Sequence, residues 1–166
     1  MLKQIKTLFL ATAVFGLSAC GFHFQNGELI PQELKNLVFE SSDPYSEMSM
    51  AMRRQLQANN INLIVEAKLD LPVLRINKLT AKDEVASIFK RGREAEKILM
   101  LEIEATVRLH GQQYPLYVKV NRTFFDNSRA ALAKAAERDV IWNDMREQAA
   151  RQLMTKMIAL QHQIDR

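Results

Sequence analysis

The chain has 166 residues, of which 48% are hydrophobic and 25% charged, a composition typical of a single globular domain. Its one cysteine excludes an intramolecular disulfide, and its three histidines occur in no metal-binding motif, so we expect no metal site and no bound cofactor. The net charge of +4 falls to +2 without residues 1–19, which contribute Lys3 and Lys6 and no acidic residue; a domain of that charge is not a polybasic nucleic-acid binder.

The first 19 residues predict a cleaved export signal. Two lysines precede an apolar run from Leu8 to Leu17, and this run is shorter than the ~20 residues that a membrane-spanning helix needs. The run ends in Leu17-Ser18-Ala19-Cys20, which resembles the lipobox of bacterial lipoproteins. In that class the chain is cut before the cysteine, whose thiol and new amino group are acylated, and Gly21 implies delivery to the outer membrane. The alternative is an ordinary signal peptide followed by a free cysteine.

Residues 20–166 are expected to form one periplasmic α+β domain, in which 20–35 serve as a short tether. After this tether, the apolar triplet Leu37-Val38-Phe39 predicts a short strand over 37–41. Lipid attached to Cys20 would hold the domain at the membrane surface, since two or more acyl chains make a stable anchor.

A helix is predicted over roughly 44–58. Asp43 is a favourable N-cap for it, and Pro44 suits the first helical position. Apolar residues then recur every four positions, as one face of a helix requires: Met48, Met52 and Leu56. Asn59 and Asn60 favour the end of this helix, because asparagine tolerates the left-handed backbone that often follows a helix.

Residues 99–125 predict a β-hairpin. Every odd position from Leu99 to Leu109 is apolar, and the even positions from Glu102 to His110 are polar, which is the pattern of a strand with one buried face. Gly111-Gln112 fits a two-residue type II′ turn, which requires glycine first. The register that satisfies both faces pairs His110 with Gln113, Val107 with Leu116, Ala105 with Val118, Ile103 with Val120, and Glu104 with Lys119.

Residues 72–124 as a whole predict a meander of about three strands. The alternation before the hairpin is less regular, so we expect a bulge or a bend there and a turn at Arg91-Gly92. A long helix closes the chain from Ala130 to Ile164, without glycine or proline, and Asp126-Asn127-Ser128 offers caps for it. Its apolar residues step by three or four: Ile141, Met145, Ala149, Leu153, Met157, Leu160 and Ile164.

These elements predict a two-layer α+β fold, with two helices packed on one face of a roughly four-stranded, mostly antiparallel sheet. The other face is expected to be wet or to meet a partner, because it carries Glu102, Glu104, Thr106, Arg108, Tyr117, Lys119 and Asn121. No catalytic motif occurs, so we expect no enzyme and no catalytic residue. Glu102 and Glu104 could resemble a carboxylate pair, as in a cell-wall hydrolase, but a solvated or lysine-paired strand face is the commoner arrangement.

One basic cluster, Lys90-Arg91-Gly92-Arg93, suggests a binding site. Three cations within four residues at a turn between strands can converge on one anion, and arginine offers a bidentate fork to phosphate. Lys134, early in the last helix, would join them if the helix start packs beside that turn, and Phe89 adds apolar surface beside the charges. The alternative is a basic turn that only aids solubility.

Several segments together resemble the LptE family of lipopolysaccharide-assembly lipoproteins. They occur in family order over nearly all of the mature chain: Cys20-Gly21-Phe22-His23-Phe24, Ser42-Asp43-Pro44, Met52-Arg53-Arg54-Gln55-Leu56, Ala86-Ser87-Ile88-Phe89, Ala95-Glu96, Val120-Asn121-Arg122-Thr123-Phe124-Phe125-Asp126-Asn127 and Ala131-Leu132-Ala133-Lys134. The combination carries the resemblance, rather than any single segment.

The resemblance implies a non-enzymatic lipoprotein in the periplasmic leaflet of the outer membrane. Such a protein plugs the large β-barrel LptD one-to-one, assists its assembly and binds lipopolysaccharide. The family's lipid-binding charge maps to Lys90 or Arg91 and to Lys134; with Arg93 of the same turn, these are our candidate lipopolysaccharide-binding residues. A rival interpretation is a periplasmic carrier that shields acyl chains in an open apolar cavity.

Overall fold

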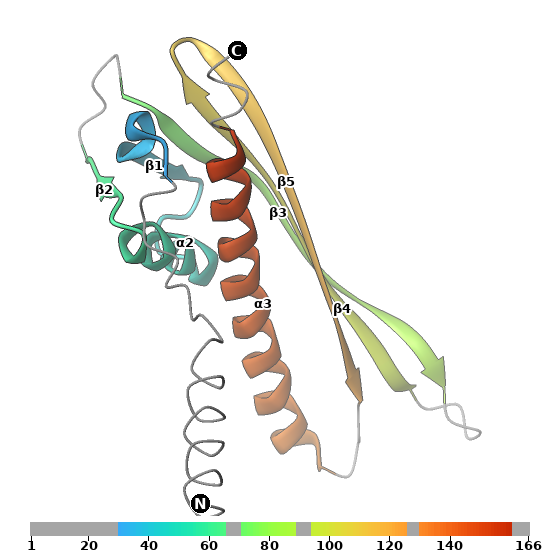
Figure 1. Ribbon diagram of the computed structural model, residues 1–166. Helices are drawn as coiled ribbons and strands as arrows, with labels where there is room; N and C mark the ends of the chain where they lie inside the picture. The colour runs from blue at the N-terminus through green and yellow to red at the C-terminus, as the bar shows by residue number, and fades with distance from the viewer. Residues whose placement is uncertain (1–29, 66–70, 89–93, 126–129, 161–166) are drawn as a thin grey trace, which may run out of the picture.

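The computed structural model describes residues 30–65, 71–88, 94–125 and 130–160. Its elements in chain order are η2 (Gln32–Leu34), β1 (Asn36–Ser41), α2 (Glu47–Ala58), β2 (Asn62–Leu63), β3 (Val73–Ile88), β4 (Glu94–Leu109), β5 (Gln112–Phe125) and α3 (Ala131–Ala159). Both helices lie on one side of the sheet (Figure 1), so the predicted two-layer α+β architecture is confirmed.

The sheet is mixed and has five strands, in the order β2-β1-β3-β4-β5, which corrects the expectation of about four mostly antiparallel strands. β1 runs parallel to both of its neighbours, and only β3, β4 and β5 form an antiparallel meander. The connection through α2 explains the difference, because parallel strands need a long crossover between them. β2 has two residues, Asn62–Leu63, too few to produce an alternating pattern in the sequence.

The β4–β5 hairpin forms with a register that differs from the predicted one by two residues. Its closing pair is Leu109 with Gln112, and the turn consists of His110 and Gly111. Both turn residues have left-handed φ angles, 49° and 77°, as a type I′ turn requires. The observed partners of Val107, Ala105, Ile103 and Glu104 are Tyr114, Leu116, Val118 and Tyr117. Because side chains alternate with a period of two, this shift changes partners but leaves every side chain on its predicted face.

The predicted irregularity in β3 is present. The register with β4 shifts between Ile76 and Lys78, between Val85 and Ser87, and again before Ile88. The first shift is a bulge that changes which residues face the helices, from even-numbered before it to odd-numbered after it. The predicted turn at Arg91-Gly92 lies outside the described residues.

α2 begins three residues later than predicted. Its N-cap is Ser46, whose Oγ accepts a hydrogen bond from the backbone N–H three residues on at 3.3 Å. Asp43 instead closes a turn ahead of the helix, because its Oδ1 accepts a hydrogen bond from the N–H of Tyr45 at 3.0 Å. The predicted end is confirmed, since Asn59 is the C-cap and Asn60 has a left-handed φ of 58°.

α3 ends at Ala159, with Leu160 as its C-cap. The predicted end at Ile164 and the predicted caps at 126–128 lie outside the described residues. Four residues of the predicted stripe are buried in α3, Met145, Ala149, Leu153 and Met157, and so is Leu160 at its C-cap. Ala150 and Met154 are buried as well, whereas Ile141 is only partly buried. The buried side chains pack in one core with the apolar face of α2 and with the odd-numbered residues of β4.

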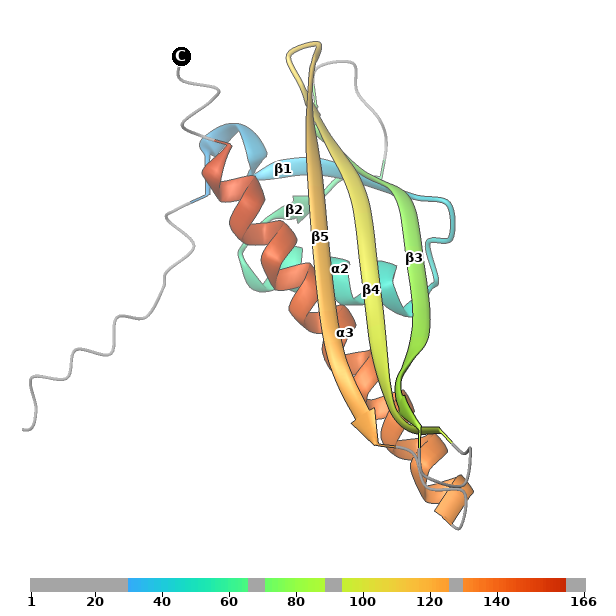
Figure 2. The ribbon, with the colours of Figure 1, turned by 90° about the vertical axis from the view of Figure 1, so that its right-hand side faces the viewer.

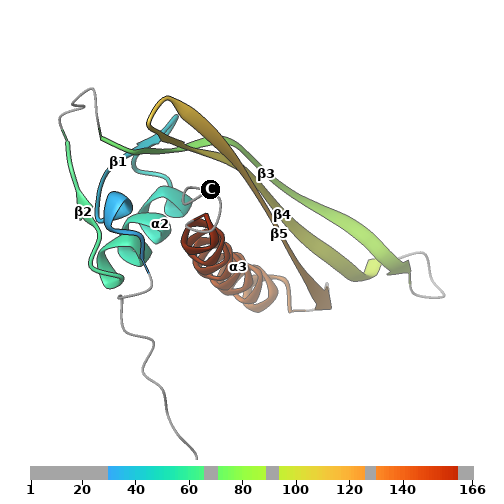
Figure 3. The ribbon, with the colours of Figure 1, turned by 45° about the horizontal axis from the view of Figure 1, so that its top comes forward.

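The two helices cover different parts of the sheet. α2 lies near β1 and β2, whereas α3 runs along β5 toward the other end of the sheet (Figures 1 and 3). The far ends of β3 and β4 extend beyond α2 in both views. One end of the sheet is therefore enclosed by both helices, and the other has only the start of α3 beside it.

Candidate functional site

The structure describes one of the four predicted binding cations. Lys134 lies early in α3, whose first turns lie beside the end of β5 (Figures 1 and 2). Lys90, Arg91 and Arg93 lie outside the described residues, and so does Cys20. Of the predicted site, only Lys134 has a described environment.

Lys134 packs against an aromatic ring at this end of the sheet. Its Nζ lies 5.4 Å from the ring centroid of Phe124, a residue of β5 that is 3% exposed. The same ammonium forms an ion pair with Glu137 Oε2 at 2.7 Å, one turn along α3. The side chain is only 24% exposed, so the ring and the helix hold the charge in a defined place.

A second cation, Lys97, occurs beside the same ring and was missed by sequence analysis. Lys97 of β4 pairs directly with Phe124 of β5, and its Nζ lies 3.6 Å from Asp83 Oδ2. Its side chain is 17% exposed, because it occupies an odd-numbered position of β4, on the helix side of the sheet. The alternation that begins at Leu99, extended two residues back, predicts this helix-side position of Lys97. A lysine on the core-facing side indicates that the core ends there.

Lys82 does not join these two cations, although it is near the basic turn in sequence. It pairs with Met100, an even-numbered residue of β4, and therefore lies on the outer face of the sheet. Its Nζ forms an ion pair with Glu84 Oε1 at 3.0 Å. The sheet separates Lys82 from Lys97 and Lys134.

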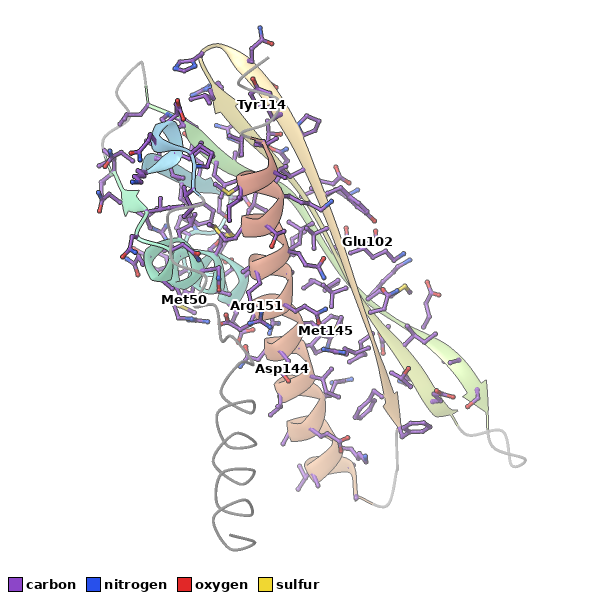
Figure 4. All side chains as sticks on the ribbon, viewed as in Figure 1. Met50, Glu102, Tyr114, Asp144, Met145 and Arg151 are labelled. Carbon is purple, nitrogen blue, oxygen red and sulfur yellow. The ribbon has the colours of Figure 1, made fainter. Side chains whose placement is uncertain are left out.

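The outer face carries paired charges rather than a catalytic carboxylate dyad. Lys119 Nζ lies 2.9 Å from Glu102 Oε1, and Lys78 Nζ lies 3.6 Å from Glu104 Oε1. The hydrogen bond from Lys119 lowers the pKa of the Glu102 carboxyl and raises the pKa of the Lys119 ammonium. Figure 4 shows Glu102 on the side of the sheet away from α3, whereas Met145 lies between α3 and the sheet. A solvated, lysine-paired face is therefore the arrangement observed.

The outer face also has a shallow pocket, near the hairpin turn. It is lined mostly by polar groups, Glu40, Arg75, Asn77, Thr106, Arg108 and Gln113, with Val73 as its apolar member. Within the described ranges, no cluster of three or more His, Cys, Asp or Glu side chains has the arrangement of a metal site. None of the described helices combines the length and apolar character that a membrane span requires.

Comparisons with known proteins give one family. Residues 34–157 match the family model described as LptE, lipopolysaccharide-assembly. The LPS-assembly lipoproteins LptE of Yersinia pestis (strain Pestoides F) and of Yersinia pseudotuberculosis serotype O:1b (strain IP 31758) are each 43% identical over 162 residues, which cover 96% of this chain and 78% of theirs.

Two solved structures share the fold. The crystal structure of rare lipoprotein B from Shewanella oneidensis is 31% identical, with a TM-score of 0.73, over 79% of this chain and 99% of that one. The solution structure of an uncharacterized lipoprotein B from Nitrosomonas europaea has a TM-score of 0.63 over 80% of this chain and 94% of that one. Its 18% identity indicates a common fold only.

Proposed function

This chain belongs to the LptE lipopolysaccharide-assembly family, and we propose that it is a non-enzymatic outer-membrane lipoprotein of lipopolysaccharide transport. Lipid on Cys20 would anchor it in the periplasmic leaflet. There the domain would plug an LptD-type β-barrel one-to-one, assist the assembly of that barrel and bind lipopolysaccharide. The observation that carries this proposal is the 43% identity to LPS-assembly lipoproteins over 96% of the chain.

The end of the sheet that only the start of α3 accompanies, called here the open end, supports lipopolysaccharide binding. The lipid A part of lipopolysaccharide has anionic phosphates beside apolar acyl chains. Lys134 lies over the ring of Phe124, and Lys97 is the direct strand partner of that residue, so two cations and an aromatic side chain occur at this end, which matches that chemistry. The predicted cations Lys90, Arg91 and Arg93 lie between β3 and β4 in the sequence. We propose that these cations dock the lipid A phosphates.

The outer face of the sheet supports enclosure by a barrel. It carries charges of both signs, several of which are paired, as Glu102 is with Lys119 and Glu104 with Lys78. Large outer-membrane barrels have polar interiors, so a wet face of mixed charge is compatible with such a lumen.

Two features of the described residues argue against the rival functions. An acyl-chain carrier needs an open apolar cavity, whereas six of the seven residues that line the pocket on the outer face are polar, and the buried apolar side chains of the described residues pack in a core. A hydrolase with Glu102 as its general acid needs a raised pKa, whereas the Lys119 hydrogen bond lowers the pKa of that carboxyl. We therefore infer a binding protein rather than a carrier or an enzyme.

Charge reversal tests the lipid-docking site. Replacing Lys90, Arg91 and Lys134 together by Asp should reduce capture of lipopolysaccharide by more than roughly tenfold, because each charge-assisted contact contributes about 1.5–3 kcal/mol. The matched control is Arg138→Asp, which reverses an exposed cation one turn further along α3. Equal thermal unfolding of both variants would show that the fold is intact. Unchanged capture by the triple variant would contradict the docking site.

Co-purification tests the partner. The full-length chain, affinity-tagged and extracted from outer membranes, should retain the LptD-type barrel in a one-to-one ratio. A chain that is recovered without acyl groups and without a barrel would contradict the proposed function as a whole.

A further inference from the structure

The described sheet has two long open edges. β1 ends at Ser41, so no described strand lies beside β3 on that side from Asn77 to Ile88. β5 is the last strand at the other side, with β4 as its only described strand neighbour. An open row of N–H and C=O groups pairs readily with another strand, and proteins protect such edges with bulges, charges and proline.

The open part of β3 has this protection. Its register with β4 shifts between Val85 and Ser87 and again before Ile88, which interrupts the regular row of backbone groups. It also carries a dense set of charges: Lys78, Lys82, Asp83 and Glu84. A second strand would find an irregular and charged edge there.

The hairpin turn determines which backbone groups of β5 face outward. The closing pair of a two-residue type I′ turn, here Leu109 with Gln112, is hydrogen-bonded, and hydrogen-bonded pairs alternate along antiparallel strands. The β4–β5 register runs without a shift from this pair to Phe125. Even-numbered residues of β5 therefore bond to β4. The odd-numbered residues direct their backbone groups to the open edge: Gln113, Pro115, Tyr117, Lys119, Asn121, Thr123 and Phe125.

Only the first part of this edge is protected. Pro115 has no N–H to offer and blocks pairing near the hairpin turn. From 117 to 125 the strand has no bulge, and the outward backbone groups make no hydrogen bond to another described residue. Its one outward-row charge, Lys119, is already paired with Glu102, and exposed aromatic rings lie at its two ends, Tyr117 at 49% and Phe125 at 62%.

We propose that residues 117–125 of β5 form a docking edge, which binds an extended segment of the outer-membrane barrel partner by β-augmentation; this segment lies outside the closed barrel wall, whose strands have no free edge. This inference rests on the proposed function, which supplies the partner. Main-chain hydrogen bonds from the outward residues would hold the added strand, and Tyr117 and Phe125 would pack against its side chains.

Charge selects the kind of strand that fits. Arg122 lies on the helix side of the docking edge, donates to the neutral amide oxygen of Gln148 at 2.9 Å, and forms no ion pair within the described residues. It fits a strand with a carboxylate opposite it. A second copy of this chain fits less well, because antiparallel pairing about Asn121 would place two Arg122 side chains diagonally across the axis, roughly 7–8 Å apart.

A single proline substitution tests the docking edge. Asn121→Pro removes an outward N–H without touching the bonds to β4, and Pro115 shows that β5 accommodates proline in the outward row. Asn121→Ala is the matched control, because it removes the same side chain and keeps the N–H. In full-length chains purified from outer membranes, Asn121→Pro should retain roughly tenfold less barrel than Asn121→Ala.

Each outcome of this experiment has one interpretation. Equal retention of the barrel by the two variants would overturn the docking edge and leave the proposed function standing. Failure of the wild-type chain to retain a barrel would refute the proposed function, and the inference with it. A wild-type dimer that Asn121→Pro converts to a monomer would identify the edge as a contact between copies and overturn the proposal.

Amide hydrogen exchange gives the same test without a mutation, in case Asn121→Pro does not fold. In the lipoprotein alone, the outward amides of Tyr117, Asn121 and Thr123 should exchange at least roughly a hundredfold faster than the inward amides of Val118 and Val120. In the complex with the barrel, the outward amides should become protected to a similar level. Outward amides that exchange equally fast with and without the barrel would contradict the proposal.

Discussion

The two parts of β3, before and after Asn77, each have a leucine on the helix side but differ in their surroundings. From Val73 to Ile76 the strand pairs with β1 on one side and β4 on the other, and Leu74 is 1% exposed. Beyond Asn77 the β1 neighbour is gone, and Leu79, which also faces the helix side, is 42% exposed. The two leucines differ in cover, not in residue type.

The strand next to β3 shows where the cover stops. Ile103 of β4, the direct partner of Leu79, is completely buried, because α3 packs over β4 and β5. The apolar side chains on the helix side of the sheet therefore continue along β3 beyond the part that the helices cover. The uncovered part leads to the end of the sheet with Lys97 and Lys134, so the uncovered half of β3 and the candidate binding end belong to the same open region.

Truncation to alanine should strongly destabilise the fold at Leu74, in the covered part of β3, and barely affect it at Leu79, in the uncovered part. Leu74→Ala is expected to lower the free energy of unfolding by about 2–5 kcal/mol, since it leaves a cavity in the core. Leu79→Ala should lower it by less than about 1 kcal/mol, because a half-exposed side chain buries little apolar area. Urea unfolding followed by circular dichroism measures both. Similar losses would show that an unseen cover protects the second half.

Removing the N-cap of α2, which packs in the same core as the covered part of β3, should destabilise the fold less than Leu74→Ala does. Ser46→Ala removes the side-chain cap of the helix that buries Met52 in the same core as Leu74, and should cost about 1 kcal/mol. Ser42→Ala is the matched control, because Ser42 is exposed and lies outside the helix. Chemical denaturation of the two variants gives the comparison. A loss as large from Ser42→Ala would mean that the turn, not the cap, stabilises this region.

The outer face should respond least, and in a pH-dependent way. Lys119→Ala should raise the pKa of Glu102 toward its ordinary value, which carboxyl NMR shifts can follow. Because the pKa of Glu102 is lowered in the folded state, the pair stabilises the fold above the ordinary carboxyl pKa. That stability disappears as pH falls through the lowered pKa.

The matching control for this pair is salt. The difference in melting temperature between wild type and Lys119→Ala should be small at neutral pH, shrink in acid and shrink again at high ionic strength, because the pair is exposed to solvent. A difference that persists in acid would show that Lys119 acts through packing rather than through its charge.

Much of the fold and part of the site can be predicted from local patterns. The alternation from Leu99 to Leu109 correctly predicts which residues of β4 face the core, and Asn60 marks the end of α2 as expected. The predicted N-cap, Asp43, is wrong because Asp43 and Ser46 are both good caps, and the side chain of Asp43 accepts a local hydrogen bond from the N–H of Tyr45 instead. The sequence alone could not predict the surroundings of Lys134, since they depend on where α3 packs against the sheet.

The sequence by itself determined the major helices and strands, and for the two helices and the β4–β5 hairpin also the face on which the apolar side chains lie, because these follow from short-range periodicity. The tertiary structure decided the parallel placement of β1, the five-strand order, the uncovered half of β3 and the grouping of Lys97, Phe124 and Lys134. These features depend on contacts between residues far apart in the chain, which no local pattern encodes. The open end of the sheet therefore results from tertiary packing, although the sequence names every residue in it.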